Sequence, residues 1–538
     1  MLLPAPPPPP ALIITGADLW VDDGKVAEAK RGWALVVRKG KIAAIGEAEK
    51  LLKAQAGVEQ VVLPGGTLLP GLIEGHAHVE SLGALARKVD LAGCRSLEEA
   101  LTRVKAWAER NPGGWIEGRG WDQNRWPGKA FPTAIQLDSV TGGRPAVMTR
   151  VDGHALWANS SAMKVAGLGP GTQAPAGGQI LRDGAGAPTG LLVDAAQQLV
   201  LRSMPAPGPQ ERSQRLLAGM RILQSHGFTA VADMGVDREA LSLYRKLQGE
   251  GRLPIRVFAY LAHDPKLMLS ELKGRRGAGT AIFQVQGVKF FLDGALGSRG
   301  ARLLEPYADQ PGQLGLWVTE PAKVEQGAAV TLRAGYQPAI HAIGDAANRM
   351  ALELLERARR KAPRSLHPRI EHAQIVAPED AARFGPLGIV ASIQPVHCTS
   401  DHSWTPARLG PSRVEEAFPW RRFLQGGALL AFGSDAPVED PNPFYGLASA
   451  ETRQDPEGQP PGGFLPAQNL TRAESLRGFT WGNGQALGRK DLGVLKAGAV
   501  ADLLWVQAPL GELPPSELRK LRPGRMWLDG RERPLEGR

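Results

Sequence analysis

The sequence predicts an α/β protein whose main domain is a (β/α)8 barrel with a long insertion after its first strand. Eight short apolar segments, many rich in β-branched residues, recur in order between residues 68 and 437, and helical stretches separate several of them. His and Asp residues stand at the carboxyl ends of several segments, the face where barrel enzymes keep their chemistry. Together these observations predict a barrel with its reactive groups at one face.

The two ends of the chain are predicted to form a separate small β-structure. Residues 11–67 contain short β-rich runs punctuated by glycine, and residues 490–538 return to this pattern in "LGVLKAGAVADLLWV". The two ends could pair into one sheet module. Residues 1–10, "MLLPAPPPPP", are expected to form a disordered polyproline-like tail, because prolines break the helix that a signal peptide requires. A truncated export signal is the alternative.

The barrel is expected to span residues 68–489. Its strands are predicted within residues 68–78, 228–235, 254–262, 286–294, 337–345, 368–374, 388–395 and 428–437. Helical periodicity is expected at residues 212–227 and 346–362, between strands of this series. This order of eight strands is the one that a (β/α)8 barrel needs.

An insertion of about residues 80–205 separates the first two predicted strands. It contains Trp115, Trp121 and Trp126, a predicted strand at 145–154 and a hairpin-like segment at 177–194. A normal βα loop has roughly 2–6 residues, so this segment is expected to lie over the mouth of the barrel.

Composition excludes several classes of function. Hydrophobic residues make up 43% and charged residues 22% of the chain, as in a soluble globular enzyme. The net charge is +10, but the basic residues are scattered among 54 acidic ones, so no nucleic-acid partner is expected. Cys94 and Cys398 lie outside any CxxC pattern, which argues against a disulfide framework or a Cys-based zinc site. No apolar run approaches the roughly 20 residues of a membrane span, so a cytoplasmic protein is expected.

A metal site is predicted from the strand ends. His76 and His78 are two residues apart, so on a strand they point to the same face and both can reach one ion. His341, His372 and Asp435 end the fifth, sixth and eighth predicted strands. A lone histidine is more often a hydrogen-bonded structural residue, but chance is a poor explanation for the whole set.

Lys289 lies in the fourth predicted strand, where a charged ammonium is costly and its pKa is expected to fall. A neutral lysine amine can react with carbon dioxide to form a carbamate, an anion able to bridge two cations. The alternative is a lysine paired with Asp293 or another carboxylate.

Together with the sequence segments around them, these candidate ligands resemble those of a known protein family. The chain is similar to the amidohydrolase superfamily, and within it to the amidohydrolase family 3 branch that includes N-substituted formamide deformylases. The matching motifs are "LPGLIEGHAH", "VKFFLDGALGSRGA", "HAIGDAA", "RIEHAQ", "SIQPVH", "FGSDAPV" and "LGVLKAGAVADLLWV". The resemblance implies a distorted TIM barrel joined to a β-sandwich made from both chain ends. It also implies metal positions at His76, His78, Lys289, His341, His372 and Asp435, with one ion or two. Relatives often have Asp where this chain has Glu74.

The expected function is metal-dependent hydrolysis of a non-peptide carbon–nitrogen bond, as in an N-substituted amide or formamide. The ligand types suit Zn²⁺, with Mn²⁺ or Fe²⁺ as alternatives, and the metal would lower the pKa of a water to give hydroxide near neutral pH. Asp435 is the predicted acid/base, and His397 is a candidate donor to the carbonyl oxygen. The predicted pocket residues are Trp121, Asp122, Asn124, Asp152, His154 and His402.

Two further interpretations stay open. The same site suits ester or lactone hydrolysis or isomerisation, because a fold does not fix chemistry. A catalytically silent binding protein would be expected to have lost part of the ligand set, and here all six positions are kept. A small-molecule substrate is expected, and a homodimer is as compatible with the sequence as a monomer.

Overall fold

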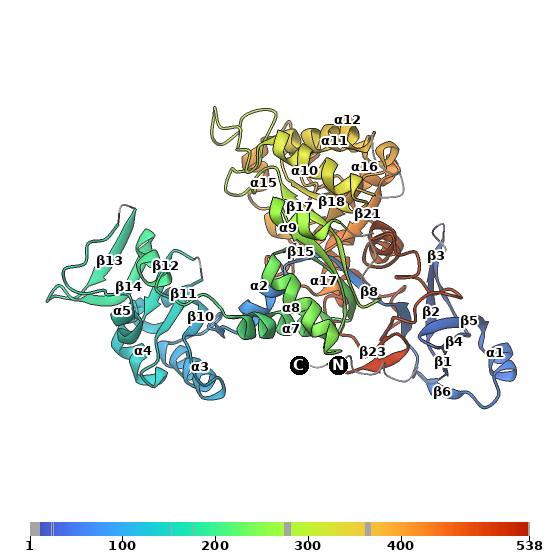
Figure 1. The fold of residues 1–538 in the computed structure, drawn as a ribbon, viewed down its shortest axis with the longest axis horizontal. Helices are drawn as coiled ribbons and strands as arrows, with labels where there is room; N and C mark the ends of the chain where they lie inside the picture. The colour runs from blue at the N-terminus through green and yellow to red at the C-terminus, as the bar shows by residue number, and fades with distance from the viewer. Residues whose placement is uncertain are drawn as a thin grey trace. The chain divides into compact units, whose positions relative to one another are not determined.

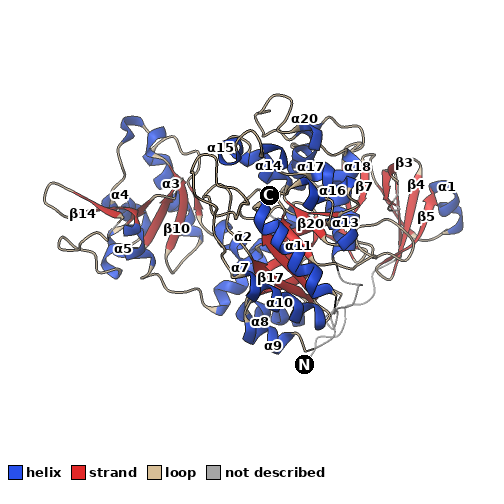
Figure 2. Ribbon diagram, turned by 90° about the horizontal axis from the view of Figure 1, so that it is seen from above, coloured by secondary structure: helices blue, strands red, loops and turns tan. Residues whose placement is uncertain are grey.

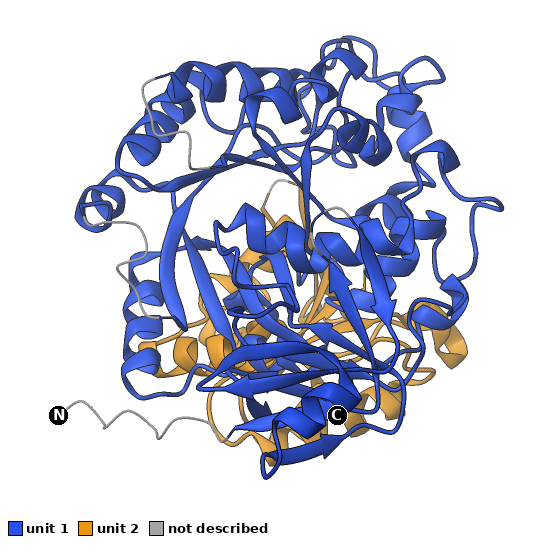
Figure 3. Cartoon of the chain, turned by 90° about the vertical axis from the view of Figure 1, so that its right-hand side faces the viewer, with its two compact units in different colours: residues 1–82, 219–538 blue, residues 83–218 orange. Residues whose placement is uncertain are grey.

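The computed structural model describes residues 11–22, 24, 26–151, 153–175, 177–273, 281–360 and 367–535. The chain divides into two compact units, shown in Figure 3. The first contains residues 1–82 and 219–538, and the second contains residues 83–218. Each unit is described by itself.

The first unit is built around one sheet of eight parallel strands (Figure 1). In sheet order these are β8 (Leu72–Ala77), β15 (Phe228–Val236), β16 (Arg256–Ala262), β17 (Phe283–Phe291), β18 (Gln337–Ala342), β19 (Arg369–His372), β20 (Val390–Ile393) and β21 (Leu429–Phe432). An isolated parallel bridge from Ala77 to Ala436 connects the two edges, so the barrel is nearly closed. The predicted (β/α)8 barrel is confirmed, with each of the eight strands where it was expected.

Helices cover the outside of the barrel strands (Figure 2). They include α8 (Arg238–Gly249), α10 (Pro321–Arg333) and α11 (Asp345–Arg359). In α8 the buried residues Ala240, Leu241, Tyr244 and Leu247 fall on one face with helical spacing, and the Asp237 carboxylate caps the first turn by accepting from the Ala240 N–H. Amphipathic spacing and a cap therefore set both the position and the start of this helix.

Both chain ends contribute to one six-stranded sheet of the first unit. Its order is β24 (Arg531–Arg533), β23 (Arg525–Leu528), β22 (Leu503–Val506), β7 (Thr67–Pro70), β2 (Asp18–Asp22) and β3 (Ala27–Lys30). A second sheet contains β5 (Lys41–Glu47), β4 (Trp33–Arg38), β1 (Leu12–Thr15) and β6 (Glu59–Val62). Leu35 of one sheet and Leu19, Leu503 and Trp527 of the other belong to one buried cluster, which gives a sandwich. Residues 68–70 pair within this module, ahead of the barrel.

The second unit is a six-stranded sheet with apolar side chains on both faces. Its strands, in order, are β13 (Gly178–Arg182), β14 (Pro188–Asp194), β12 (Ala155–Ala158), β11 (Ala146–Arg150), β10 (Ile116–Trp121) and β9 (Val89–Asp90). Val147 and Met148 alternate along β11 and enter different buried clusters, as the two-residue period of a strand requires. The helices α3 (Leu97–Arg110), α4 (Ala134–Thr141) and α5 (Ser160–Val165) complete this unit.

Of the remaining described helices, α7 (Pro209–Ser225) is long and the rest are short. The others include α1 (Ala48–Ala54), α2 (Val79–Ala86), α6 (Gln198–Leu201), α9 (Pro265–Glu271), α14 (Pro395–Asp401), α15 (Thr405–Leu409), α16 (Trp420–Gln425), α17 (Pro443–Thr452), α18 (Arg472–Arg477) and α20 (Pro515–Leu518). Among the described residues, none of the helices is long and apolar enough to cross a membrane.

Candidate metal centre

The carboxyl ends of three barrel strands bring four histidines together. His76 lies in β8 and His78 just after it, His341 lies in β18, and His372 ends β19. The ring centres of His76 and His372 are 5.0 Å apart, and those of His341 and His372 are 4.5 Å apart. Asp435 follows β21 and joins this group, because parallel strands of a barrel end at one face.

In this group the Asp435 carboxylate faces the Nε2 lone pairs of two histidines. Asp435 Oδ1 lies 3.2 Å from His78 Nε2 and 3.4 Å from His76 Nε2. The other ring nitrogens face acceptors: His76 Nδ1 is 2.7 Å from Glu371 Oε2, and His78 Nδ1 is 3.0 Å from Met234 O. Each Nδ1 therefore carries the proton and donates it, which leaves each Nε2 with a lone pair directed at a carboxylate oxygen.

That arrangement fits a cation. Three electron-rich atoms at these distances repel one another unless a positive charge lies between them. Ligand atoms that sit about 2.0–2.1 Å from a tetrahedral Zn²⁺ are about 3.3 Å apart, close to the spacings of Asp435 Oδ1 from the two histidines. Asp435 Oδ1 and His341 Nε2 are also buried without a hydrogen-bond partner among the described residues. The donor set thus matches a divalent metal.

Burial keeps the imidazoles neutral. It lowers the pKa of His76 to about 4 and that of His341 to about 3, and the charge on Lys289 adds to both effects. It also holds the pKa of His372 well below the usual value. Burial acts to raise the pKa of Asp435, but the attraction of the neighbouring histidines in their protonated form outweighs it, so the pKa lies well below its ordinary range and the carboxylate stays ionised when the imidazoles are neutral. At neutral pH the group presents neutral nitrogen donors and an ionised carboxylate, the forms that bind metal.

Lys289 in β17 adds an amine to the same group. Its side chain is 1% exposed, its Nζ lies 3.3 Å from His76 Nε2, and burial lowers its pKa to about 8. Within the described residues, no carboxylate lies at ion-pair distance from it. Asp293, the alternative partner, instead accepts hydrogen bonds from the backbone N–H groups of Arg302, Ile343 and Gly344.

A buried ion pair supports His76, and it was missed in the sequence. Glu371 Oε1 accepts from Arg369 Nε at 2.8 Å, and neither side chain is exposed. Arg369 also donates to Gly75 O and to Ser392 Oγ, both at 2.7 Å. The signal was present in "RIEH", where Arg369 and Glu371 carry opposite charges two residues apart and so lie on the same face of a strand that is otherwise apolar.

Comparison with known proteins agrees with this geometry. The model of the amidohydrolase family matches residues 61–533. The chain belongs to the amidohydrolase family. Among its relatives in that family, Protein LONG AFTER FAR-RED 3 of Arabidopsis thaliana is 34% identical over 509 residues, which cover 92% of this chain and 86% of the relative. N-substituted formamide deformylase of Arthrobacter pascens is 27% identical, with 96% of this chain and 97% of the relative covered.

A solved structure extends the comparison to the fold. An uncharacterized metal-dependent hydrolase from Pyrococcus horikoshii OT3 has a TM-score of 0.77 and 26% identity, covering 94% of this chain and 99% of that one. The predicted amidohydrolase family 3 membership is confirmed, and the solved structure that resembles this chain over nearly its whole length is named as a metal-dependent hydrolase.

Two candidate ligands of this amidohydrolase have strained backbones. His372 has φ of 71° and Asp435 has φ of 58°, in the left-handed region that costs non-glycine residues about 1–3 kcal/mol. Hydrogen bonds hold this geometry: the Asp435 N–H donates to His76 O at 2.7 Å. Glu74 Oε1 accepts from the N–H groups of His76 and Ser434, both at 2.9 Å, so Glu74 provides local support at this position.

His397 and His402 both lie on or just after α14, but in different surroundings. His397 Nε2 lies 3.8 Å from Asp435 Oδ2, and its ring stacks on His372 with centres 5.9 Å apart. His402 Nε2 instead lies 3.4 Å from Asp455 Oδ2, and His402 is in neither group of possible metal ligands. Only His397 therefore joins the metal-site group.

The other predicted pocket residues belong to the second unit. Trp121 is fully buried in that unit's core and donates from Nε1 to Met148 O. Asp122 Oδ1 accepts from the N–H of Asn124, and the exposed His154 places Nδ1 2.7 Å from Asp194 Oδ1. Asp152 lies outside the described residues. A contact of these side chains with substrate stays a prediction.

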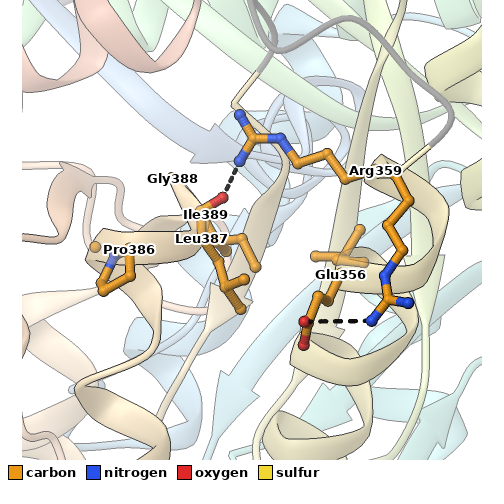
Figure 4. A pocket seen from close by; sticks show the side chains of 9 residues that line it. Glu356, Arg359, Pro386, Leu387, Gly388 and Ile389 are labelled. Atoms are coloured by element: carbon orange, nitrogen blue, oxygen red, sulfur yellow. Dashed lines mark hydrogen bonds and ion pairs between the residues drawn. The ribbon is translucent and has the colours of Figure 1, made fainter.

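A separate cavity of about 390 Å³ lies at the opposite end of the barrel strands (Figure 4). It is lined by the end of α11 and by residues 385–389, which precede β20. There, Arg359 donates from its guanidinium to Leu387 O. Because the lining contains no His, Cys or Asp, this cavity offers none of the chemistry found at the carboxyl ends.

Proposed function

We propose that this amidohydrolase cleaves a non-peptide carbon–nitrogen bond, in an N-substituted amide or formamide, with a divalent metal held at the barrel mouth. The observation that carries the proposal is the Asp435 carboxylate facing the lone pairs of His76 and His78 at 3.2–3.4 Å. The A. pascens relative, named N-substituted formamide deformylase and aligned over nearly its whole length, supports the substrate class.

The residues have distinct tasks in this reaction. His76, His78, His341, His372 and Asp435 would hold the metal, and Zn²⁺ suits these donors best, with Mn²⁺ or Fe²⁺ as alternatives. The bound metal supplies a Lewis acid for the carbonyl and a water that ionises near neutral pH. Asp435 takes the proton of the attacking water and gives it to the leaving nitrogen. Glu371 and Met234 O hold two of the imidazole rings in the required tautomer.

Lys289 is proposed to carry a carbamate. Its neutral amine would add to carbon dioxide, forming an N–C bond and releasing one proton, so the product is an anion beside His76. Burial supports this chemistry, because a pKa near 8 gives the amine a larger neutral fraction at neutral pH than a free lysine has. The anion would also balance the charge of a second cation.

The test is a substrate panel on metal-loaded protein. It contains N-substituted formamides, N-substituted acetamides and esters with the same acyl groups, assayed with wild type, Asp435→Asn and Asp440→Asn. Asp440 is exposed and serves as the matched control. We expect amide turnover in wild type and in the control, and none in Asp435→Asn. Turnover of esters alone, or full activity in Asp435→Asn, would contradict the proposal.

A further inference from the structure

A different cavity, of about 630 Å³, is lined only by residues of the second unit. Its walls come from residues 84–88, from the end of α3 and the loop after it, from the start of β10, and from residues 204–215. Its volume falls within the roughly 300–1,000 Å³ of pockets that bind small molecules. No candidate metal ligand is among its described lining residues, so this cavity is distinct from the metal centre.

Basic side chains outnumber acidic ones in the wall of this cavity. Four basic and two acidic side chains line it, which gives a net charge of +2. Both acidic side chains are already paired: Lys88 Nζ lies 2.9 Å from Glu117 Oε2, and Arg215 Nη2 lies 2.5 Å from Glu211 Oε1. The two carboxylates are therefore neutralised by their own partners, and the excess positive charge belongs to the other two basic side chains.

Those two side chains, Arg87 and Arg110, have no counter-charge. Both are exposed, and no carboxylate lies at ion-pair distance from either within the described part of the chain. Arg110 donates from Nε to Ala106 O at 3.0 Å, one turn earlier in α3, which leaves its two terminal nitrogens available. Two guanidiniums without partners at one concave surface attract an anion.

The loop after α3 keeps its carbonyl oxygens away from this space. Arg144 does not line the cavity, and its guanidinium donates to four backbone carbonyls, those of Ala108, Asn111, Gly113 and Gly114. These oxygens are directed at Arg144 rather than at a ligand in the cavity. The side chain of Asn111 also donates from Nδ2 to Trp107 O at 2.9 Å. The loop is thus fixed in place with its acceptors already used, which lowers the cost of ordering it around an anion.

Two tryptophans supply the apolar part of the wall. Trp107 packs against the buried cluster that contains Met148, and Trp115 packs against the cluster that contains Val147. Both indoles are half-buried and line the cavity, so the core anchors each ring and leaves part of its surface for a ligand. Aromatic rings pack well against such surfaces.

We propose that this cavity binds a small aromatic carboxylate, with its ring against Trp107 and Trp115 and its carboxylate bound by Arg87 and Arg110. The planar guanidinium carries donors at the spacing of the two carboxylate oxygens. Phosphate would meet the same charges but would leave the indoles uncovered. The inference concerns binding alone and does not depend on the proposed hydrolysis.

The test is isothermal titration calorimetry of the full-length protein, as purified, with 2-naphthoate. Three further probes separate the parts of this molecule: 2-naphthamide has the ring without the charge, acetate has the carboxylate without the ring, and inorganic phosphate is an anion of another shape. We expect one saturable site for 2-naphthoate, and affinities at least about tenfold lower for each of the other three probes, since a hydrogen bond to a charged group contributes this much.

Variants of the two arginines locate the site. Arg87→Gln and Arg110→Gln should each weaken the binding of 2-naphthoate by about 10–100-fold, because each removes charge-assisted hydrogen bonds to the carboxylate. Arg119→Gln is the matched control and should bind as wild type does. Arg119 is an exposed arginine of the second unit, without a carboxylate at ion-pair distance among the described residues, and it does not line the cavity. Melting temperatures equal to that of wild type show that the variants are folded.

Three results would overturn the inference. The first is the absence of saturable binding of 2-naphthoate to wild type. The second is an unchanged affinity in both arginine variants, which would place the ligand elsewhere, such as at the metal centre. The third is equal affinity for 2-naphthamide or for phosphate, which would mean that the ring alone or the charge alone is recognised.

Discussion

Replacing Glu371 with glutamine should destabilise the protein strongly and weaken its metal site. Glu371 and Arg369 are both fully buried, and removing one partner of a buried ion pair costs about 3–5 kcal/mol, because the other charge is left uncompensated. Arg369 keeps Gly75 O and Ser392 Oγ as acceptors, which places the expected cost near the lower bound, about 3 kcal/mol. That is a large share of the roughly 5–15 kcal/mol that stabilises a folded protein.

The assay compares this variant with a chemically identical change at the surface. Glu379 also pairs with an arginine, Arg349, at 2.6 Å, but its side chain is 67% exposed. Glu379→Gln should therefore cost at most about 1 kcal/mol. Urea unfolding of the metal-free proteins gives both free energies, and Co²⁺ titration gives the affinity, expected to fall about 10–100-fold only for Glu371→Gln. Equal urea midpoints for the two variants would refute the reasoning.

At acid pH, the free energies of unfolding of wild type and Glu371→Gln should differ less than at neutral pH. Burial acts to raise the pKa of Glu371, but the charge on Arg369 and the hydrogen bond from His76 outweigh it and hold the pKa well below its ordinary value. The carboxylate therefore stabilises the fold fully above the unfolded pKa of about 4.3, and this contribution is lost as the pH falls below it. Urea midpoints measured at pH 7 and pH 3.5 should differ less between the two proteins at the lower pH.

Three other changes test separate parts of the structure. Gly433→Ala would place a Cβ 2.5 Å from the His76 backbone N, so it should cost about 1–3 kcal/mol and weaken metal binding, whereas the exposed Gly249→Ala should change stability by at most about 1 kcal/mol. Arg256→Met leaves the buried Asp502 without its ion-pair partner and should lower the free energy of unfolding in urea by about 3–5 kcal/mol. The double variant with Asp502→Leu should regain most of that free energy, and a double variant as unstable as Arg256→Met would contradict a direct pairing. Chelation of the metal should lower the free energy of unfolding by about 2.7 kcal/mol relative to protein at 100 times the dissociation constant, and an unchanged melting curve would argue against a site formed in the folded state.

The barrel was predictable because its signals are local. Each strand is a short apolar run, and the spacing of His76 and His78 follows from the two-residue period of a strand. Once the strands are known to be parallel, the residues at their carboxyl ends are expected at one face of the barrel. The same logic placed His341 and His372 close together.

The contacts that support the site were less accessible to sequence reasoning. Arg369 and Glu371 are charged residues in a strand, and only the three-dimensional neighbours show that they pair with each other rather than face water. His397 follows a strand in the sequence as a loop residue would, but its place in the first turn of a short helix is what directs it toward Asp435. The start of the barrel was also ambiguous, because residues 68–70 pair with β22.

The closing of the barrel also determines when the site can exist during synthesis. Glu74 and Ser434, which hydrogen-bond to each other beside the candidate metal ligands, are separated by 360 residues in the chain. Asp435 therefore leaves the ribosome long after His76 and His78, and every nascent chain passes through a stage in which two imidazoles lack their carboxylate. Contacts so distant in sequence form late in folding. Metal binding at the proposed site would thus report that the last strand has paired with the first, and a chain ending before residue 435 would not bind metal in this way.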